Sequence, residues 1–485
     1  MTETSVTNQP SDKRPVRDFK LRSAFALSFA DQSPIVGIYT IFVISILAAG
    51  PAFLWAFPIV LAGQLFVCAV FGNLASKWPL QGSVYAWSRE LIGPRYGWFT
   101  GWAYMWGLTL TLAVLPLAAA PYLLGALGVD APSQITVELV ALGVLLFGTV
   151  TNLLAGPLLK TLIYIALTAE VIASAGIGIA LLIFHRVNPW SVIFNTGGTG
   201  HGTGWLVGPF LLPVAYIAYT FIGFEASASI GEEVKESRKV LPKAVMLCLV
   251  VGGVLVILAS LGLVLAIPDM SAVLSGKDAN PIATTLETSF GSGAGRTLLV
   301  ALVIGFTSSM IAVQTAVTRA IWASARDRVL PGARLLSRLS GRENLPRFAI
   351  GLTFVIAGAL LFAGTSKVFT LLVSFSAFGF YLSYWFPVAG LASKHWRGQS
   401  PTSDAWGARS IRAVTTVAVI WLTLEIVNLA WPRAVFSDWY LNWGIIIMTG
   451  ALGVLGALIA LRSFRPGSPA LQAQQPPVGA EAEEA

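Results

Sequence analysis

Twelve apolar runs, each about as long as a membrane crossing, constrain this chain more than any other feature of its sequence. A helix needs about 20 apolar residues to cross a hydrocarbon core of about 30 Å. The runs cover residues 24–49, 53–75, 98–124, 134–156, 161–185, 208–230, 241–267, 297–323, 348–364, 368–392, 411–431 and 440–462. We therefore predict an all-α integral membrane protein of about 12 transmembrane helices.

The composition excludes an ordinary soluble domain. Only 11% of the residues are charged and the mean hydropathy is +0.75, whereas soluble domains carry about 25% charged residues. The net charge of +8 is spread over short loops instead of forming one basic patch, so we expect no nucleic-acid partner. The expected partner is instead the lipid bilayer.

The lysines and arginines predict the orientation of the spans. With the N-terminus inside, 31 basic residues divide so that only five lie outside: Arg186, Lys277, Arg296, Lys367 and Arg433. Because basic residues favour cytoplasmic loops, we predict a multi-pass protein of the cell (plasma) membrane with both termini cytoplasmic.

The sequence offers no catalytic set and no metal site. Cys68 and Cys248 lie within apolar runs, and His185, His201 and His395 are scattered without metal-ligand spacing. A channel would show a repeated filter, and none is evident. We therefore predict a transporter that is not an enzyme, has no cofactor and binds no metal centre.

Two spans contain breaks. Span 1 is interrupted by the segment from Asp31 to Gly37, in which Pro34 lacks a backbone donor. Span 6 is interrupted at residues 223–225, where Glu225 is a carboxyl group at membrane depth that costs about 2.5–3.5 kcal/mol unless it is compensated. The two spans are five apart, as expected for inverted repeats that each open with a discontinuous helix.

Such breaks expose backbone groups that bind small ions. The free N–H groups of residues 35–38 would attract a carboxylate, and the carbonyl groups near Ser33 and Ile222 would attract an ammonium group. A zwitterionic amino acid satisfies both. The expected substrate-binding residues are Ser33, Pro34, Ile35, Val36, Gly37, Phe221, Gly223, Phe224 and Glu225. The two phenylalanines either cover the substrate or are ordinary core residues.

A coupling ion has two candidate sites. Glu170 is a lone acid in apolar span 5 and is suited to carry a proton, although a purely structural role is the competing interpretation. Thr307, Ser308 and Ser309 of span 8 offer hydroxyl groups for a sodium ion, or for helix packing. Asp31 either faces the cavity or pairs with Lys20 or Arg22 near the cytoplasmic end of span 1, and we favour the second.

Two charged segments, residues 235–243 and 326–347, are expected to be cytoplasmic loops that orient the chain and gate the site. In them Asp327 lies beside Arg326 and Arg328, and residues 232–233 are two glutamates near Arg238. Either these charges form salt bridges that break when the inner gate opens, or they are solvated.

Four stretches together resemble the amino acid/polyamine/organocation (APC) superfamily. They are SPIVGIY in span 1, KWPLQGSVYAWSRELIGPRYGWFTGW at 77–102, GFEASASIGEEVKESRKVLPKAV after span 6 and TRAIWASARDRVLPG at 318–332. The branch that looks most similar is the bacterial amino acid, GABA and amine permeases. The resemblance implies the leucine-transporter fold, a 5+5 inverted repeat plus two extra spans with alternating access. Residues 35–37 depart from the usual glycine-serine-glycine and keep only Gly37.

These inferences predict a domain organisation and a function. Residues 1–22 form a disordered cytoplasmic tail, 23–392 the transporter core with repeats 23–185 and 208–392, 393–464 spans 11 and 12, and 465–485 a second disordered tail. The predicted function is proton-coupled amino acid import, with proton or sodium as coupling ion. The alternative is a transporter of amines or polyamines (putrescine, ethanolamine or GABA-like), sodium-coupled or an exchanger.

Overall fold

A computed structural model describes residues 20–129, 132–154, 169–170, 172–278, 280–340, 345–363, 366–399, 408–433 and 438–465. Within these ranges all regular secondary structure is helical. The helices are α1 (Leu21–Gln32), α2 (Pro34–Ala49), η1 (Pro51–Trp55), α3 (Ala56–Lys77), α4 (Ser83–Leu91), α5 (Pro94–Ala126), α6 (Gln134–Leu154), η2 (Ile172–Gly176), α8 (Ile177–Phe184), η3 (Trp190–Phe194), α9 (Gly202–Val207), α10 (Leu211–Ile217), η4 (Ala218–Phe221), η5 (Ala226–Glu233), α11 (Ser237–Ala266), α12 (Met270–Leu274), α13 (Pro281–Phe290), α14 (Ser292–Arg326), α15 (Ala333–Leu336), α16 (Arg347–Leu361), α17 (Ser366–Trp396), α18 (Ala408–Ala430), α19 (Trp439–Asn442) and α20 (Gly444–Ser463).

The predicted all-α membrane fold is confirmed. In the described part of the chain, 10 helical stretches are long and apolar enough to cross a membrane, and they coincide with ten of the predicted spans. The other two predicted spans contain the shorter apolar helices Ile172–Phe184 and Arg347–Leu361. Most of the first half of predicted span 5 and nearly all of both predicted tails lie outside the described residues.

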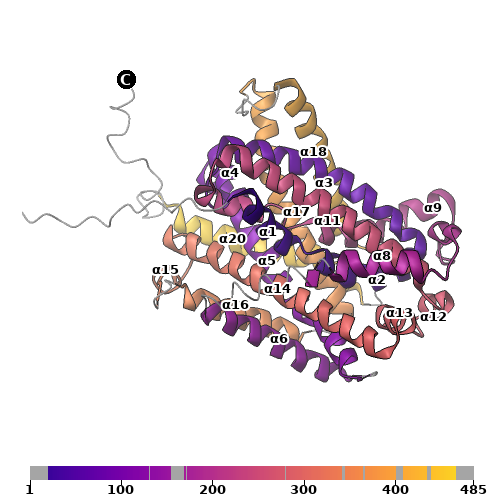
Figure 1. Cartoon of the computed structure of the whole chain (residues 1–485). Coiled ribbons are helices and arrows are strands. Elements are labelled where there is room, and N and C mark those ends of the chain that lie inside the picture. The colour runs from indigo at the N-terminus through magenta and orange to yellow at the C-terminus, as the bar shows by residue number, and fades with distance from the viewer. Residues whose placement is uncertain are drawn as a thin grey trace, which may run out of the picture.

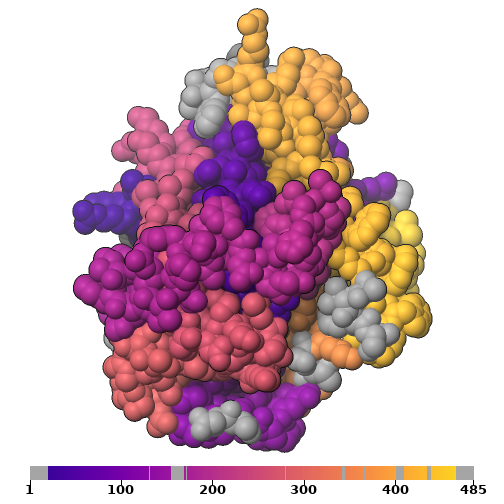
Figure 2. All heavy atoms as spheres, turned by 90° about the vertical axis from the view of Figure 1, so that its right-hand side faces the viewer, coloured from indigo at the N-terminus to yellow at the C-terminus, as the bar shows by residue number. Residues whose placement is uncertain are grey.

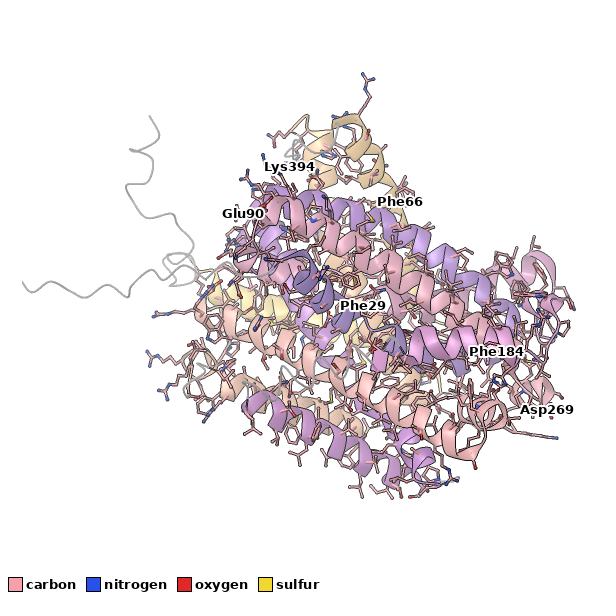
Figure 3. The ribbon with its side chains drawn as sticks, in the orientation of Figure 1. Phe29, Phe66, Glu90, Phe184, Asp269 and Lys394 are labelled. Carbon is pink, nitrogen blue, oxygen red and sulfur yellow. The ribbon has the colours of Figure 1, made fainter. Side chains whose placement is uncertain are left out.

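The helices form one elongated bundle around α1 and α2, which lie near its middle in Figure 1. Helices α3 and α11 cover them on one side and α14 on the other, with α6 and α16 farther out and α18 at the opposite edge. Figure 3 places Phe29 of α1 in the centre, Glu90 and Lys394 at one end of the bundle, and Asp269 at the other. Glu90 and Lys394, which come from two loops predicted for the same membrane face, therefore share one end.

The outer surface of the bundle is suited to lipid. Large apolar side chains point away from the core, such as Phe66 of α3, Phe147 of α6 and Val454 of α20. Figure 3 shows Phe66 at the edge of the bundle. The end that carries Asp269 is shown in Figure 2, where the magenta segment with η3 and α9 lies across the face above the salmon α12 and α13. An apolar belt between two polar ends is the arrangement that a bilayer requires.

Span 1 is broken where the sequence predicts it. α1 ends at Gln32, and α2 begins with Pro34 at its first position, where a missing N–H costs nothing. Between them, Ser33 has φ 41° and ψ 99°, which stops the helical ladder. The side chain of Ser33 accepts a hydrogen bond from the Val36 N–H and so caps α2.

Span 6 is broken as well. The α10 helix tightens into the 3-10 turn η4, Ile222 is extended, and Gly223 has φ +86°, a conformation that glycine adopts without strain. A further 3-10 segment, η5, follows from Ala226. The predicted break at residues 223–225 is confirmed.

The two breaks lie against each other. The Thr220 hydroxyl donates to the Gly37 carbonyl over 2.9 Å, and a Cβ added to Gly37 would lie 2.5 Å from the Thr220 Cγ2 atom. A Cβ added to Gly223 would in turn lie 2.8 Å from the Asp31 Oδ2 atom. Each break therefore uses one glycine to let the other break approach.

The first of the two predicted cytoplasmic loops is mostly helix. α11 begins at Ser237 and runs through Pro242, so only the first residues of this predicted loop, 235 and 236, form a turn. The loop prediction was wrong for this segment, because the helix of span 7 begins at Ser237 and continues through Pro242 in spite of the backbone donor that this proline lacks. In the second predicted loop, α14 ends at Arg326 and α16 begins at Arg347, with the single turn of α15 between them.

Candidate substrate and coupling site

Glu170 sits at the N-terminus of α2. Its Oε1 atom accepts hydrogen bonds from the Ser33 hydroxyl at 2.8 Å and from the Ile35 N–H at 2.9 Å. The side chain is buried, with a residue exposure of 4%. The positive end of a helix dipole and its free N–H groups favour an anion at this position. The structure thus brings Glu170 together with two residues of the predicted substrate site.

The anion-binding groups of α2 are engaged by the chain itself. The Ile35 N–H donates a hydrogen bond to Glu170. The Val36 N–H donates to the Ser33 hydroxyl at 3.3 Å, and the Gly37 N–H donates to the Ser33 carbonyl at 3.0 Å. The substrate carboxylate expected at these N–H groups would have to replace one of these partners. Glu170 is the partner whose charge can change.

Helix α14 packs closely against Ile35 and Glu170. A Cβ on Gly305 would lie 2.4 Å from the Ile35 Cδ1 atom and 3.4 Å from the Glu170 Oε2 atom. Of the three predicted sodium hydroxyls on α14, Thr307 donates to the Val303 carbonyl over 2.7 Å and Ser308 is half-buried. Ser309 is buried, and its hydroxyl has no hydrogen-bond partner among the described residues.

Glu225 is fully buried at the span 6 break. Its Oε2 atom accepts a hydrogen bond of 2.5 Å from the Tyr384 hydroxyl of α17, and that same hydroxyl accepts from the Gly223 N–H at 3.0 Å. The Tyr104 hydroxyl of α5 also interacts with this carboxyl group. The Oε1 atom has no hydrogen-bond partner in the described part of the chain. One carboxyl oxygen is thus free to bind a donor.

Asp31 lies at the same break, so the pairing that we favoured from the sequence is wrong. Its Oδ2 atom lies beside Gly223, its charge interacts with Glu225, and the ion pairs of the described residues do not join it to Lys20 or Arg22. The chain stops being helical one residue later, which places Asp31 at the break. Two acids now face one short gap in the backbone.

The aromatic residues of the break are packed into the core. Phe221 lies edge-on to Phe57 with ring centroids 6.5 Å apart, and Phe224 lies 5.8 Å from the Phe71 ring and 5.6 Å from the Tyr384 ring. Both phenylalanines are fully buried. This packing agrees with the interpretation of the two phenylalanines as core residues that support the break.

Sequence reasoning did not find Tyr384, Tyr104 or Gln64. The Gln64 Nε2 atom of α3 donates to the Phe221 carbonyl at 3.1 Å, which satisfies a group that the break leaves free. A tyrosine or glutamine in an apolar run carries little signal, because such residues also serve ordinary packing. Only their position opposite the break reveals their role.

The end of the bundle that carries Glu90 also holds a set of polar contacts. The Tyr85 hydroxyl donates to Asp327 over 3.4 Å, and Arg326 pairs with Asp327 at 3.4 Å. The glutamates at 232 and 233 accept hydrogen bonds from Gln81, at 3.2 and 3.3 Å, instead of pairing with Arg238. Burial, followed by the charge of Asp327, raises the pKa of Tyr85 to about 12, so its hydroxyl stays a donor at physiological pH.

Comparison with known proteins agrees with this architecture. The family model described as amino acid permease matches residues 19–452, which is most of the chain. The chain belongs to the amino acid permease family. The members are membrane transporters and not enzymes, which confirms the predicted class and the resemblance to the APC superfamily.

Several permease-family relatives match along most of their length. A branched-chain amino acid permease of Bacillus subtilis is 23% identical over 87% of this chain and 91% of its own. An amino-acid permease of Arabidopsis thaliana is 26% identical over 77% of each chain. A choline transporter of Saccharomyces cerevisiae is 26% identical over 78% of this chain and 69% of its own. The relatives therefore include proteins named for amino acids and one named for choline.

Proposed function

We propose that this permease imports an amino acid together with a proton, by alternating access across the plasma membrane, with both termini in the cytoplasm. The observation that carries the proposal is the position of Glu170 on the Ile35 N–H. Glu170 can gain a proton, and it accepts the hydrogen bond from the Ile35 N–H, which is the backbone donor that a substrate carboxylate would need. Proton binding and substrate binding are therefore linked at one atom.

The linkage works by exchange of one anion for another. A proton adds to a carboxylate oxygen of Glu170, and the neutral carboxyl group becomes a weaker acceptor for the Ile35 N–H and the Ser33 hydroxyl. The substrate carboxylate then accepts these two hydrogen bonds. When the proton leaves, Glu170 regains its charge and displaces the substrate. This cycle moves one proton with each amino acid.

The ammonium end of the substrate would lie at the span 6 break. The free Oε1 atom of Glu225 and the carboxylate of Asp31 face this gap. A bound ammonium group would compensate the buried Glu225 and the half-buried Asp31, which otherwise repel each other. The carbonyl groups freed by the break add further acceptors.

Alternating access is supported by the way the breaks meet. We place them at the start of two inverted repeats, residues 23–185 and 208–392, as the sequence predicts. Because Gly37 and Gly223 have no side chain of their own, the two breaks approach closely, with Thr220 and Asp31 against these glycines, and this contact is where the two repeats would rock. The polar contacts of Tyr85 and Asp327 would then open and close on the cytoplasmic side.

One observation favours the alternative substrate class, an amine without a carboxylate. The acids at the span 6 break outnumber the anion-binding groups that remain free, because Glu170 and Ser33 already engage α2. Sodium is the alternative coupling ion, with the Ser309 hydroxyl as the group of α14 that is buried and free to bind it. An exchanger would need neither ion.

Uptake into proteoliposomes tests these choices. Purified protein is offered a pool of labelled amino acids and amines under an imposed proton gradient, an imposed sodium gradient, or no gradient. We expect amino acid accumulation with the proton gradient alone. Accumulation of amines only would contradict the proposed amino acid substrate. Dependence of uptake on the sodium gradient would contradict the proposed proton coupling. Uptake that occurs only when the liposomes are preloaded with substrate would indicate an exchanger.

A further inference from the structure

One of the buried acids that lie outside both broken helices is on α18. Glu425 of α18 has a residue exposure of 3%. Trp421 and Asn428 stand four residues before it and three after it, so the three side chains share one face of the helix. Helix α18 packs against α3 and α17. This polar face of α18, which comprises Trp421, Glu425 and Asn428, therefore points into the protein and not into lipid.

Four polar atoms around this face lack hydrogen-bond partners among the described residues. They are the Glu425 Oε2, Gln64 Oε1, Tyr381 hydroxyl and Trp421 Nε1 atoms. Two of these atoms are acceptors, one is a donor, and the Tyr381 hydroxyl is both. Tyr381 and Gln64 are fully buried. A buried donor or acceptor without a hydrogen-bond partner costs free energy of folding, unless a water molecule or an added proton supplies the missing hydrogen bond.

Tyr381 stands between the acid and the span 6 break. Its hydroxyl interacts with Glu425 and lies within reach of Gln64. Gln64 in turn holds the Phe221 carbonyl at the break through its Nε2 atom. The single hydroxyl hydrogen of Tyr381 therefore has two candidate acceptors, one on α18 and one on the residue that supports the break.

The other end of the polar face leads to the edge of the bundle. The Asn428 Nδ2 atom donates to the Leu211 carbonyl at 3.1 Å, and Arg433 donates to the Asn428 carbonyl at 2.7 Å. The titratable or charged groups that face Glu425 are Tyr381 of α17 and Arg433, with Tyr216 of α10 near Arg433. The contribution of α3 is the neutral Gln64.

We infer that Glu425 is a second proton-binding site, which acts on the span 6 break through Tyr381 and Gln64. A proton from the aqueous phase adds to a Glu425 carboxylate oxygen, and no other bond forms or breaks. The charged carboxylate is the stronger acceptor and takes the Tyr381 hydrogen, directly after a small rotation or through a bridging water. Once Glu425 is protonated, the Tyr381 hydrogen turns to the Gln64 Oε1 atom and strengthens the support of the Phe221 carbonyl.

Infrared difference spectroscopy tests protonation without relying on transport. Spectra of the full-length protein in liposomes are recorded between high and low pH, for wild type, Glu425→Gln and the control Glu138→Gln. Glu138 is a buried acid of α6 that accepts a hydrogen bond from Gln134. We expect Glu425→Gln to lose one pH-dependent carboxylic-acid band that Glu138→Gln retains. A spectrum of Glu425→Gln that matches wild type would overturn the inference.

A second variant tests the connection to the break. Tyr381→Phe keeps the ring and removes the hydroxyl, and it leaves Glu425 in place. We expect its carboxylic-acid band to titrate at a different pH, and the KM for the transported substrate to change less between high and low pH than in wild type. An unchanged titration midpoint and an unchanged KM ratio would overturn the route through Tyr381.

The inference and the proposed function fail separately. If no amino acid is taken up, the infrared band of Glu425 still decides whether this residue binds a proton. If uptake is proton-coupled but the band is absent, Glu170 alone carries the coupling proton and the second site is wrong.

Discussion

The break between α1 and α2 and the break between η4 and η5 each place a buried carboxyl group beside the backbone of an interrupted helix, but the two acids are held differently. The Glu170 Oε1 atom has two donors, the Ser33 hydroxyl and the Ile35 N–H. The Glu225 Oε2 atom accepts from Tyr384, the Tyr104 hydroxyl also interacts with this carboxyl group, and the Oε1 atom has no hydrogen-bond partner among the described residues. Asp31 adds a second acid beside Glu225 only.

The difference follows from the direction of the helices. At the α2 break the chain presents N–H groups, so an acid there is stabilised and acts as a stand-in for an external anion. At the span 6 break the chain presents carbonyl groups, and two acids there lack a cation. At the first break Glu170 and Ser33 already occupy the N–H groups, whereas no ion pair among the described residues brings a cation to Glu225 or Asp31. The comparison suggests that the proton is sensed at one break and the cationic end of the substrate at the other.

The largest expected effect is that of Glu170→Gln. The neutral amide mimics a permanently protonated acid, so the proton gradient no longer drives accumulation, and the accumulation ratio should fall to about one. Exchange of labelled for unlabelled substrate should persist. Both are measured in proteoliposomes, with Glu138→Gln as a buried-acid control. Undiminished proton-driven accumulation in Glu170→Gln would show that the α2 break does not sense the proton.

Glu225→Gln should act on substrate affinity instead. Loss of a charged hydrogen bond removes about 1.5–3 kcal/mol, which corresponds to a rise in KM of about tenfold or more. The pH dependence of uptake should stay as in wild type, because Glu170 is intact. Initial uptake rates at several pH values measure both. A lost gradient response with an unchanged KM would mean that the roles of the two breaks are reversed.

Gly37→Ala tests whether the breaks must touch. The added Cβ meets Thr220, and overpacking of this kind costs about 1–3 kcal/mol. We expect a lower apparent Tm in detergent and slower transport. Gly351→Ala is the matched control, since an added Cβ there meets nothing within 4 Å. Equal Tm values for the two variants would argue against close contact between the breaks.

The smallest effect is expected for Tyr85→Phe at the end of the bundle. Removal of the long, part-buried hydrogen bond from Tyr85 to the Asp327 carboxylate, worth about 0.5–1.5 kcal/mol, should speed exchange by about two- to tenfold if this contact closes the cytoplasmic side. Burial and the charge of Asp327 raise the pKa of Tyr85 to about 12, so the hydroxyl keeps its proton across the physiological pH range. The difference in exchange rate between Tyr85→Phe and wild type should therefore not change with pH in that range. Tyr440→Phe, an exposed tyrosine, is the control. Unchanged exchange would remove Tyr85 from the gate.

The places where the helices break could be predicted from the sequence, because their causes are local. Pro34 lacks a donor, Gly223 admits a positive φ, and an acid in an apolar run needs compensation wherever it lies. The membrane class follows equally directly from the length and hydropathy of the apolar runs. These properties do not depend on what lies across the bundle.

What each acid contacts was decided only by the tertiary structure. Ser33 and Glu170 are 137 residues apart, and Glu225 and Tyr384 are 159 apart. No local pattern links such residues, because their contact depends on how whole helices pack. Asp31 illustrates the limit: its position in the sequence suggested a pair with Lys20 or Arg22, and the turn of the chain at Ser33 placed it beside Gly223 instead. The sequence by itself determined that there are breaks and acids, and the packing of the helices determined which break each acid serves.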